Sequence, residues 1–329
     1  MVWVHFAFST ILVVLAATKL SEYGDAIAVR TKLGGLFIGT LLLAGITSIP
    51  ELTSTVSAIK QGEPNLAAGN MFGSNMFNMF LLAVLNLIYW RERILERVVL
   101  KHALTASLVS LLGGIILFFV MAKLNLMVGW VGLDSIAVIV VYFAGIWLIR
   151  VDSAKDVEST ETEIEERHLP GLRHAVIGFI AASAVLLVSA PKLVKSCVDI
   201  AAVTGLNTGF VGTALLAIVT SLPELVASVS AIRSGAHDLA VGNLFGSCMF
   251  NLFGIGLADV FYRGGHFMAE IDPMFALAAL LALILTTFGL VGNVVRVQRR
   301  SVLADLDAWL IALTYPLGLF LLYARGIRL

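Results

Sequence analysis

Two glutamates lie inside long apolar stretches of the chain, and both stand in the same short motif. Glu51 closes Thr-Ser-Ile-Pro-Glu, and Glu224 closes Thr-Ser-Leu-Pro-Glu. A charged side chain at the centre of a membrane-spanning helix costs about 2.5–3.5 kcal/mol, so such a residue usually faces a protein interior or an ion pathway. A basic neighbour would give a purely structural explanation, but neither 33–59 nor 206–232 contains a lysine or arginine. We therefore predict that both glutamates are cation ligands.

The two motifs belong to an internal repeat. Gly39–Phe80 returns 173 positions later, without a gap, as Gly212–Phe253, and 26 of the 42 aligned residues are identical. Chance does not produce such agreement, so each copy is one structural unit of a duplicated protein. Paired apolar helices interrupted by proline at corresponding positions are the best sequence indication of a transporter's binding site.

Each proline should interrupt its helix just before the glutamate. Pro50 and Pro223 have no N–H, so the carbonyls of Ile46 and Val219, four residues earlier, lose their helical partners. Unpaired carbonyls at membrane depth are tolerated only where they face protein, water or an ion. The glutamate that follows lies in the first turn of the next half-helix, where the positive end of the helix dipole favours a carboxylate.

Further oxygen donors recur at helical spacing around the motif. A threonine stands four residues before each glutamate and an alanine seven residues before it; the next apolar segment carries a serine and an asparagine four residues apart. Residues four apart share a helix face, so we expect the two repeats to surround a mid-membrane cavity with carboxylate, hydroxyl, amide and backbone oxygens. Such hard donors suit Ca²⁺ and Na⁺ rather than thiophilic metals. The candidate cation-binding residues are Glu51, Glu224, Thr47, Thr220, Ser74, Ser247, Asn78, Asn251, Ala44 and Ala217.

Structural interpretations stay open beside this one. Hydroxyls in membrane helices can donate back to their own helix, an alternative that is as well supported as ion binding for Ser48 and Ser221. Glycines beside the second motif, such as Gly69 and Gly73, are expected to allow close helix packing.

The composition is that of a membrane protein. The chain is 59% hydrophobic and 13% charged with a net charge of zero, whereas soluble domains are about 45–50% apolar and 25% charged. No basic surplus favours nucleic acid as a partner. The two cysteines have no metal-ligand spacing, the six histidines form no cluster, and no nucleophile–base pair stands outside the ion site, so we expect neither an enzyme nor a cofactor. The apolar N-terminus lacks the basic start of a signal peptide and should be retained.

Ten apolar runs are long enough to cross a hydrocarbon core of about 30 Å. They fall at 2–20, 33–59, 65–90, 100–122 and 127–149, and at 174–195, 206–232, 239–262, 273–292 and 302–324. We expect an all-α integral membrane protein with ten transmembrane helices: a five-helix repeat over 1–150, an acidic cytoplasmic connector over 151–173, and a second five-helix repeat over 174–329. An odd number of spans gives the repeats inverted topology. Fifteen basic residues on one predicted face against seven on the other make the first face cytoplasmic and both termini extracellular.

The two motifs also carry a family resemblance. Thr-Ser-x-Pro-Glu followed by Gly-Asn-x-Phe-Gly-Ser-x-x-Phe-Asn, in both copies, resembles the alpha repeats of the cation/calcium exchanger superfamily, nearest its sodium/calcium exchangers. This resemblance implies a ten-helix antiporter of the cell membrane that exports Ca²⁺ in exchange for Na⁺ by alternating access. Helices one and six would slide across a core of helices two, three, seven and eight.

The resemblance also implies a role for each candidate residue. The Ca²⁺ ligands would be Glu51, Glu224 and the backbone oxygens of Thr47 and Thr220. The Na⁺ ligands would be Ser74, Ser247, Thr47, Thr220, Ala44 and Ala217, with Asn78 nearby. Asn251 stands where some members carry an aspartate, which argues against potassium co-transport, and Cys248 replaces the counterpart of Asn75.

Other transport classes remain alternatives. One Ca²⁺, two Na⁺ or two protons would each neutralise the two glutamates, so occupancy by one species disfavours another. A proton/calcium antiporter, or one for another divalent cation, is therefore the strongest alternative; proton-coupled relatives usually resemble Gly-Asn-Ala-x-Glu in the second motif. A cation channel or a non-transporting scaffold is a further possibility. The sequence is compatible with a monomer in the lipid bilayer and does not specify an oligomeric state.

Overall fold

The computed structural model describes residues 1–30, 43–90, 94–153, 170–233, 235–272, 274–294 and 306–326, and within these ranges the chain is almost entirely helical. The long helices are α1 (Val2–Arg30), α4 (Pro64–Ile88), α5 (Ile94–Ala122), α6 (Leu133–Ser153), α7 (Leu172–Thr204), α11 (His237–Phe261), α13 (Met274–Val294) and α14 (Leu306–Gly326). The shorter elements are α3 (Ile49–Lys60), α8 (Thr208–Val211), the π-helical turn η2 (Gly212–Leu216), α9 (Ala217–Thr220), α10 (Leu222–Arg233), α12 (Phe267–Glu270), and the antiparallel strands β1 (Met127–Val128) and β2 (Val131–Gly132).

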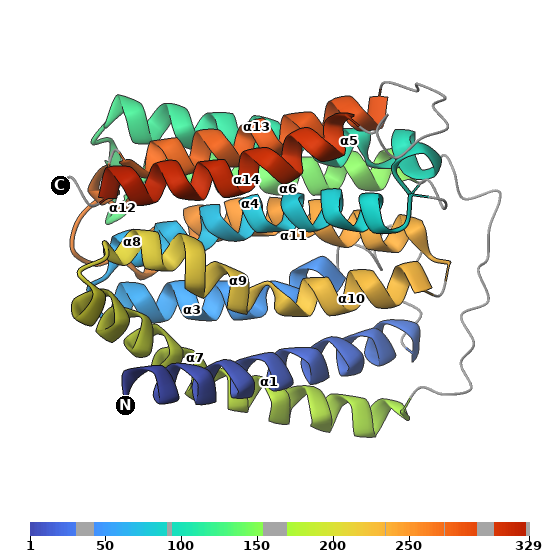
Figure 1. Ribbon diagram of the computed structural model, residues 1–329, viewed down its shortest axis with the longest axis horizontal. Helices are drawn as coiled ribbons and strands as arrows, with labels where there is room; N and C mark the ends of the chain where they lie inside the picture. Colours follow the sequence, from blue (N-terminus) through green and yellow to red (C-terminus); the bar gives the residue numbers. More distant parts are fainter. Residues whose placement is uncertain are drawn as a thin grey trace.

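The helices form three layers (Figure 1). One outer layer consists of α1 packed along α7. The middle layer contains α3, α4 and the elements from α8 to α11, and the opposite outer layer contains α5, α6, α13 and α14. The interrupted helices therefore lie in the middle layer, where neighbours cover them on both sides.

Helices at equivalent positions of the repeat make equivalent contacts. α1 packs against α7, α4 against α11, and α5 against α13. Tyr142 stacks on Phe253 with ring centroids 4.4 Å apart, and Tyr315 stacks on Phe80 at 4.6 Å. The residues of the second pair lie 173 positions from those of the first. The same contact is thus made twice, once from each half, as a duplicated fold requires.

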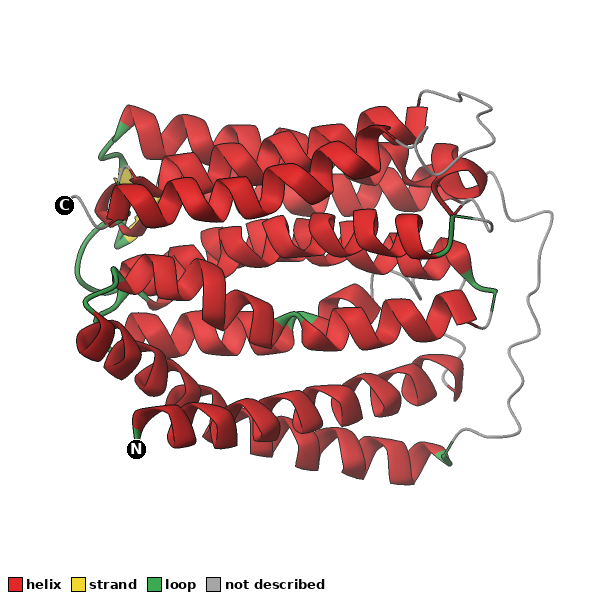
Figure 2. Cartoon of the chain, in the orientation of Figure 1, coloured by secondary structure: helices red, strands yellow, loops and turns green. Residues whose placement is uncertain are grey.

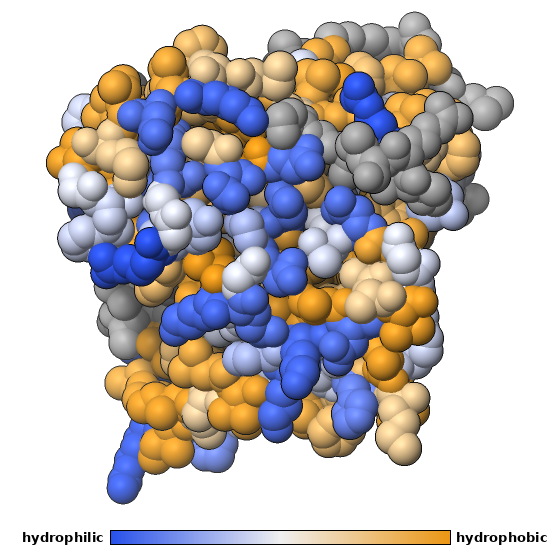
Figure 3. Space-filling model, turned by 90° about the vertical axis from the view of Figure 1, so that its left-hand side faces the viewer, coloured by the Kyte–Doolittle hydropathy of each residue, from blue (hydrophilic) through white to orange (hydrophobic). Residues whose placement is uncertain are grey.

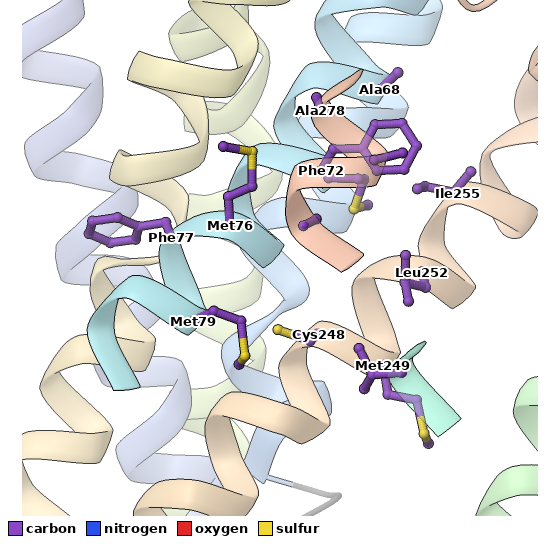
Figure 4. Close-up of a cluster of buried hydrophobic side chains, with 14 of the residues drawn as sticks. Ala68, Phe72, Met76, Phe77, Met79, Cys248, Met249, Leu252, Ile255 and Ala278 are labelled. Atoms are coloured by element: carbon purple, nitrogen blue, oxygen red, sulfur yellow. The ribbon is translucent and has the colours of Figure 1, made fainter. Parts of the chain in front are cut away.

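The core is centred on α4 and α11. Phe72, Met76 and Met79 from α4 and Leu252 and Ile255 from α11 belong to one cluster of buried apolar side chains, and all five are at most 3% exposed (Figure 4). Aromatic rings and flexible methionines fill the irregular space between the crossing helices. This apolar core fixes the positions of α4 and α11, the helices that carry the serines and asparagines predicted to bind cations.

Two glycines bring α4 close to the second half of the chain. A Cβ at Gly69 would lie 2.3 Å from the carbonyl oxygen of Gly209, and a Cβ at Gly73 would lie 2.5 Å from that of Thr213. Only glycine fits at such distances. The predicted packing role of Gly69 and Gly73 is therefore confirmed.

Eight helices in the described ranges are long and apolar enough to cross a membrane, and they overlap eight of the ten predicted runs. The run predicted at 127–149 began too early, because the β1–β2 hairpin comes first and α6 begins at Leu133. The run at 273–292 contains the shorter apolar helix Phe275–Val291. The run at 33–59 begins outside the described residues, and so does most of the predicted connector at 151–173. The complete ten-helix arrangement, the domain boundaries and the orientation of the termini therefore stay predictions.

Two predicted spans are shorter than the helices that contain them. The first run was predicted at 2–20, whereas α1 continues to Arg30, and α7 extends beyond the predicted 174–195 to Thr204. Hydropathy finds the apolar part of a helix and not its end, because polar residues can continue the same helix. In α1, an ion pair between Lys19 and Glu22, spaced i, i+3, supports this continuation.

The surface fits a protein that spans a lipid bilayer. Trp3, Phe118, Trp147 and Phe320, on the two outer layers, are all more than half exposed. At the end of the bundle that carries both termini, hydrophilic residues lie across the middle and apolar residues around the margin (Figure 3). Exposed apolar sides with a polar end are expected when lipid covers the sides and water covers the end.

Candidate cation site

Both proline motifs interrupt their helices at the same position. Residues 43–47 are helical, Ser48 leaves the helix with φ −88° and ψ 5°, and α3 then begins. In the second copy Ser221 has φ −90° and ψ 7° between α9 and α10. Figure 2 draws this second break as a short loop in the middle of the bundle. The break falls two residues before Pro50 and Pro223, because each proline takes one of the first helical positions, where its missing N–H costs nothing.

Each glutamate is bonded to the break of the opposite half. The Ser221 hydroxyl donates to Glu51 Oε1 at 2.8 Å, and the Ser48 hydroxyl donates to Glu224 Oε1 at 3.0 Å. Both carboxylates are 0% exposed. The Oε2 atom of each has no hydrogen-bond partner within the described part of the chain. One oxygen of each carboxylate is therefore oriented by the protein, and the other is available to a ligand.

The site holds two carboxyl groups with no basic partner among the described residues. Neither Glu51 nor Glu224 forms an ion pair with a residue in the described ranges, and each reaches the helix break of the opposite half. Buried charges in folded proteins are paired, coordinate a metal, or become neutral by binding a proton. The structure therefore brings both glutamates to the place where the two halves meet, and their role as cation ligands stays a prediction.

The two threonines contact the opposite half as well. Thr47 Oγ1 lies 3.2 Å from Asn243 Oδ1 and 3.4 Å from the Ser247 hydroxyl. Thr220 Oγ1 lies 3.2 Å from Asn70 Oδ1. Both hydroxyls are also within reach of carbonyls of their own helices, Ala44 for Thr47 and Leu216 for Thr220. The same side-chain position thus allows each hydroxyl to donate to its own helix and to face the opposite half, and the role of the threonines as cation ligands stays a prediction.

The predicted alanine carbonyls lie at the site. The Ala44 oxygen is 3.2 Å from Thr47 Oγ1 and 3.4 Å from Ser247 Oγ, and the Ala217 oxygen is 3.3 Å from Thr220 Oγ1. These oxygens belong to the turns just before the two breaks, where a carbonyl can face inward. They are oxygen donors of the kind that Na⁺ and Ca²⁺ take.

The polar residues of α4 and α11 are buried with unused hydrogen-bonding capacity. Ser74 Oγ and both side-chain polar atoms of Asn78 have no partner among the described residues, and Asn251 uses only its Nδ2, which donates to Asn75 Oδ1 at 3.1 Å. Ser74, Asn78 and Asn251 are 0% exposed. An unpaired buried polar atom costs about 1–3 kcal/mol. The oxygens of Ser74, Asn78 and Asn251 are available to a cation or to water, whereas Asn78 Nδ2 can only donate, for example to water.

Sequence reasoning missed an asparagine in each copy. Asn70 Nδ2 donates to the Glu51 backbone oxygen at 3.1 Å and to Thr55 Oγ1 at 3.0 Å, while its Oδ1 accepts from Thr220. Asn243 occupies the equivalent position and contacts Thr47. The signal was present, since both lie in the repeated Gly-Asn-x-Phe-Gly-Ser sequence. Each asparagine contacts the threonine of the opposite half, so it links the two halves beside the glutamates.

We compared the sequence with models of known protein families. The model of the family described as sodium/calcium exchanger protein matches residues 1–150 and 174–324. The chain belongs to this family. It is therefore an integral membrane protein of the cation/calcium exchanger superfamily, and the family consists of membrane exchangers.

The chain is also similar to two curated relatives and to one solved structure. The chain is 29% identical over 295 residues to a putative antiporter, CaxA, of Alkalimonas amylolytica, covering 88% of this chain and 90% of that protein. It is 28% identical over 308 residues to the sodium/calcium exchanger MaX1 of Methanosarcina acetivorans, covering 80% and 85%. Its fold is similar to the crystal structure of the H⁺/Ca²⁺ exchanger CAX, with a TM-score of 0.64, 15% identity, and coverage of 99% and 89%.

Proposed function

We propose that this protein is a secondary antiporter that exchanges Ca²⁺ for Na⁺ across the cell membrane by alternating access. The observation that carries the proposal is the crossed pairing at the two helix breaks, where Ser221 holds Glu51 and Ser48 holds Glu224. It joins both halves of the molecule at one site, so a movement of either half changes the surroundings of both carboxylates.

The charge of the site accounts for exchange. Two ionised glutamates contribute −2, which one Ca²⁺ or two Na⁺ would neutralise. Additional positive charge is poorly screened in a buried site, so one kind of ion excludes the other. Antiport requires this mutual exclusion. A third Na⁺ would add net charge and make transport sensitive to voltage, by about 2.3 kcal/mol per charge per 100 mV.

The donors around the glutamates favour Na⁺ over H⁺ as the coupling ion. Na⁺ needs several oxygen ligands, and the site offers the hydroxyls of Thr47, Thr220 and Ser247 and the carbonyls of Ala44 and Ala217. A proton needs only a carboxylate. Proton/calcium exchange is the second candidate, because the chain resembles both a sodium/calcium exchanger and an H⁺/Ca²⁺ exchanger.

The layered arrangement suggests how access would alternate. α1 and α7 form an outer layer of their own; α1 contacts the interrupted helices through α3 and α10, and α7 contacts them through α3 and η2. Sliding of this pair would open the site first to one side and then to the other. We propose ten helices in two inverted repeats, with both termini outside and the monomer as the working unit.

Reconstituted proteoliposomes would test the coupling ion. Uptake of ⁴⁵Ca²⁺ is measured with an outward Na⁺ gradient, with a pH gradient, and with neither. We expect the Na⁺ gradient to drive uptake and the pH gradient alone to fail. Uptake driven only by the pH gradient would refute Na⁺ coupling, and rapid flux with neither counter-ion would indicate a channel.

The control variants separate the site from general effects of substitution. Glu51→Gln and Glu224→Gln should each abolish uptake driven by the Na⁺ gradient. The matched control is Glu63→Gln, which makes the same change at a half-buried residue just before α4, and it should keep most of the parent's uptake. If all three variants were equally active, the two buried glutamates would not be the transport site.

A further inference from the structure

We propose a second, separate metal site that takes a divalent transition metal of the Zn²⁺ class at the end of the bundle that carries both termini. Its ligands are Asp134 at the start of α6, Asp259 near the end of α11 and His266 just before α12. One ligand atom from each residue lies within 4.8 Å of the others, and all three residues are buried. They come from three segments that only the fold brings together.

The three side chains are already oriented by the protein. His266 Nε2 lies 2.8 Å and 2.7 Å from the two oxygens of Asp134, and the Ser135 backbone N–H donates to Asp134 Oδ1 at 2.6 Å. The Asp259 carboxylate accepts from the backbone N–H of Gly132 at 2.5 Å and of Phe267 at 2.8 Å. The three backbone N–H bonds are outer hydrogen bonds of the kind that fix ligands in position and raise metal affinity. A bound metal would take the place of the direct bond between His266 Nε2 and Asp134.

The donor set selects the class of metal. One imidazole nitrogen with two carboxylates suits Zn²⁺ and related transition metals, whereas Ca²⁺ and Mg²⁺ prefer oxygen alone. Three protein ligands leave one position for water in the four-coordinate geometry of zinc. The central site, built from oxygen donors only, should prefer different ions.

The charge and the backbone both favour a bound cation here. Two buried carboxylates face one imidazole, and the nearby Arg263 stacks on Trp130 at 4.1 Å rather than pairing with either aspartate. His266 Nδ1 is buried with no partner among the described residues. Gly132 lets the backbone of the hairpin lie close to two of the proposed ligands, since a Cβ there would lie 2.2 Å from Asp134 Oδ1 and 2.3 Å from His266 Nε2.

The internal repeat indicates that the fold itself does not require this triad. At the corresponding positions, 173 residues away, the sequence has Asn86, Arg93 and Asp307. One carboxylate and a guanidinium cannot hold a metal in the same way, because arginine stays protonated and has no free lone pair. Two aspartates and a histidine are therefore particular to one end of the molecule.

A metal at this site would fasten the β1–β2 hairpin to the turn between α11 and α12. Gly132 of the hairpin and Phe267 of α12 already bind the same carboxylate. A ligand that binds only the folded state stabilises it. We therefore expect Zn²⁺ to raise the melting temperature of the protein. We do not expect ion transport to depend on this metal.

The test uses full-length protein, purified in detergent, treated with a chelator and carrying Glu51→Gln and Glu224→Gln to silence the central site. Titration calorimetry with Zn²⁺ and visible absorption with Co²⁺ report binding, and thermal melting reports stability. We expect one Zn²⁺ per chain and an upward shift in melting temperature. His266→Ala and Asp134→Asn should each lower the affinity at least tenfold and remove the shift, whereas His5→Ala, at an exposed histidine of α1, should change neither.

Two results would overturn the proposal. One is the absence of Zn²⁺ binding at micromolar concentration, and the other is Zn²⁺ binding that is as tight in His266→Ala as in the parent. If the variants do not fold, X-ray absorption of the Zn²⁺-loaded parent decides. One imidazole nitrogen with carboxylate oxygens around the metal supports the site, and any other ligand set refutes it.

Discussion

Glu51→Gln removes one charge from the central site while keeping the shape of the side chain. Gln retains an acceptor oxygen for the Ser221 hydroxyl, which lies 2.8 Å from Glu51 Oε1. The variant should therefore fold like the parent. Its effect on Ca²⁺ binding then reports the electrostatic contribution of a single carboxylate.

The expected size of this effect follows from burial. Glu51 is 0% exposed and has no ion-pair partner in the described ranges, so its interaction with a bound cation is only weakly screened. At an effective dielectric constant of about 20, two unit charges 4 Å apart interact by roughly 4 kcal/mol. Ca²⁺ carries two charges, and desolvation offsets part of the gain. A net loss of about 4 kcal/mol lowers the Ca²⁺ affinity by roughly three orders of magnitude.

Equilibrium binding of ⁴⁵Ca²⁺ to purified protein measures this loss. Because Glu224 is equally buried and bonded in the equivalent way, Glu224→Gln should lose a similar amount. Glu63→Gln serves as the matched control and should leave the affinity unchanged. A Ca²⁺ dissociation constant for Glu51→Gln within tenfold of the parent value would refute this prediction. It would mean that the Glu51 carboxylate either does not contact Ca²⁺ or is screened by solvent.

Three further outcomes follow from the packing. Gly73→Ala should lower the free energy of unfolding by about 1–3 kcal/mol, because its Cβ would meet backbone atoms at 2.5–2.6 Å. Gly114→Ala is the control and should cause no such loss, because a Cβ there would have open space within 4 Å outside its own helix. Equal melting temperatures for the two variants would contradict this prediction. Tyr315→Phe should be neutral or raise the melting temperature, because the buried hydroxyl has no partner among the described residues, and a clear loss of stability would contradict it. Asn70→Ala removes three hydrogen bonds behind the site and should slow Ca²⁺ uptake in proteoliposomes more than tenfold; unchanged uptake would show that the bridge is dispensable.

The repeat and the proline motifs made the main features predictable. Two Thr-Ser-x-Pro-Glu motifs predicted both helix breaks, and the apolar context of Glu51 and Glu224 predicted a shared site. Residue spacing within one helix also indicated the side on which Thr47 and Thr220 stand. These features depend on local sequence, which a single chain provides.

The contacts between the halves were not predictable in the same way. Nothing in the sequence states that Ser48 bonds to Glu224 or that Asn70 reaches Thr220, because these pairs depend on how the halves are placed against each other. The same limit hid His266, which looked isolated among scattered histidines until the fold placed it beside two aspartates. Helix ends at polar residues, as in α1, were missed because hydropathy does not mark them.

We propose that Glu51 and Glu224 form one site that Ca²⁺ and Na⁺ occupy in turn. The stoichiometry of ⁴⁵Ca²⁺ binding to purified protein at increasing Na⁺ concentration tests this proposal. We expect one Ca²⁺ per chain, displaced completely by Na⁺ and lost in either single Glu→Gln variant. Two Ca²⁺ per chain, of which each variant loses only one, or binding that Na⁺ does not displace, would contradict it.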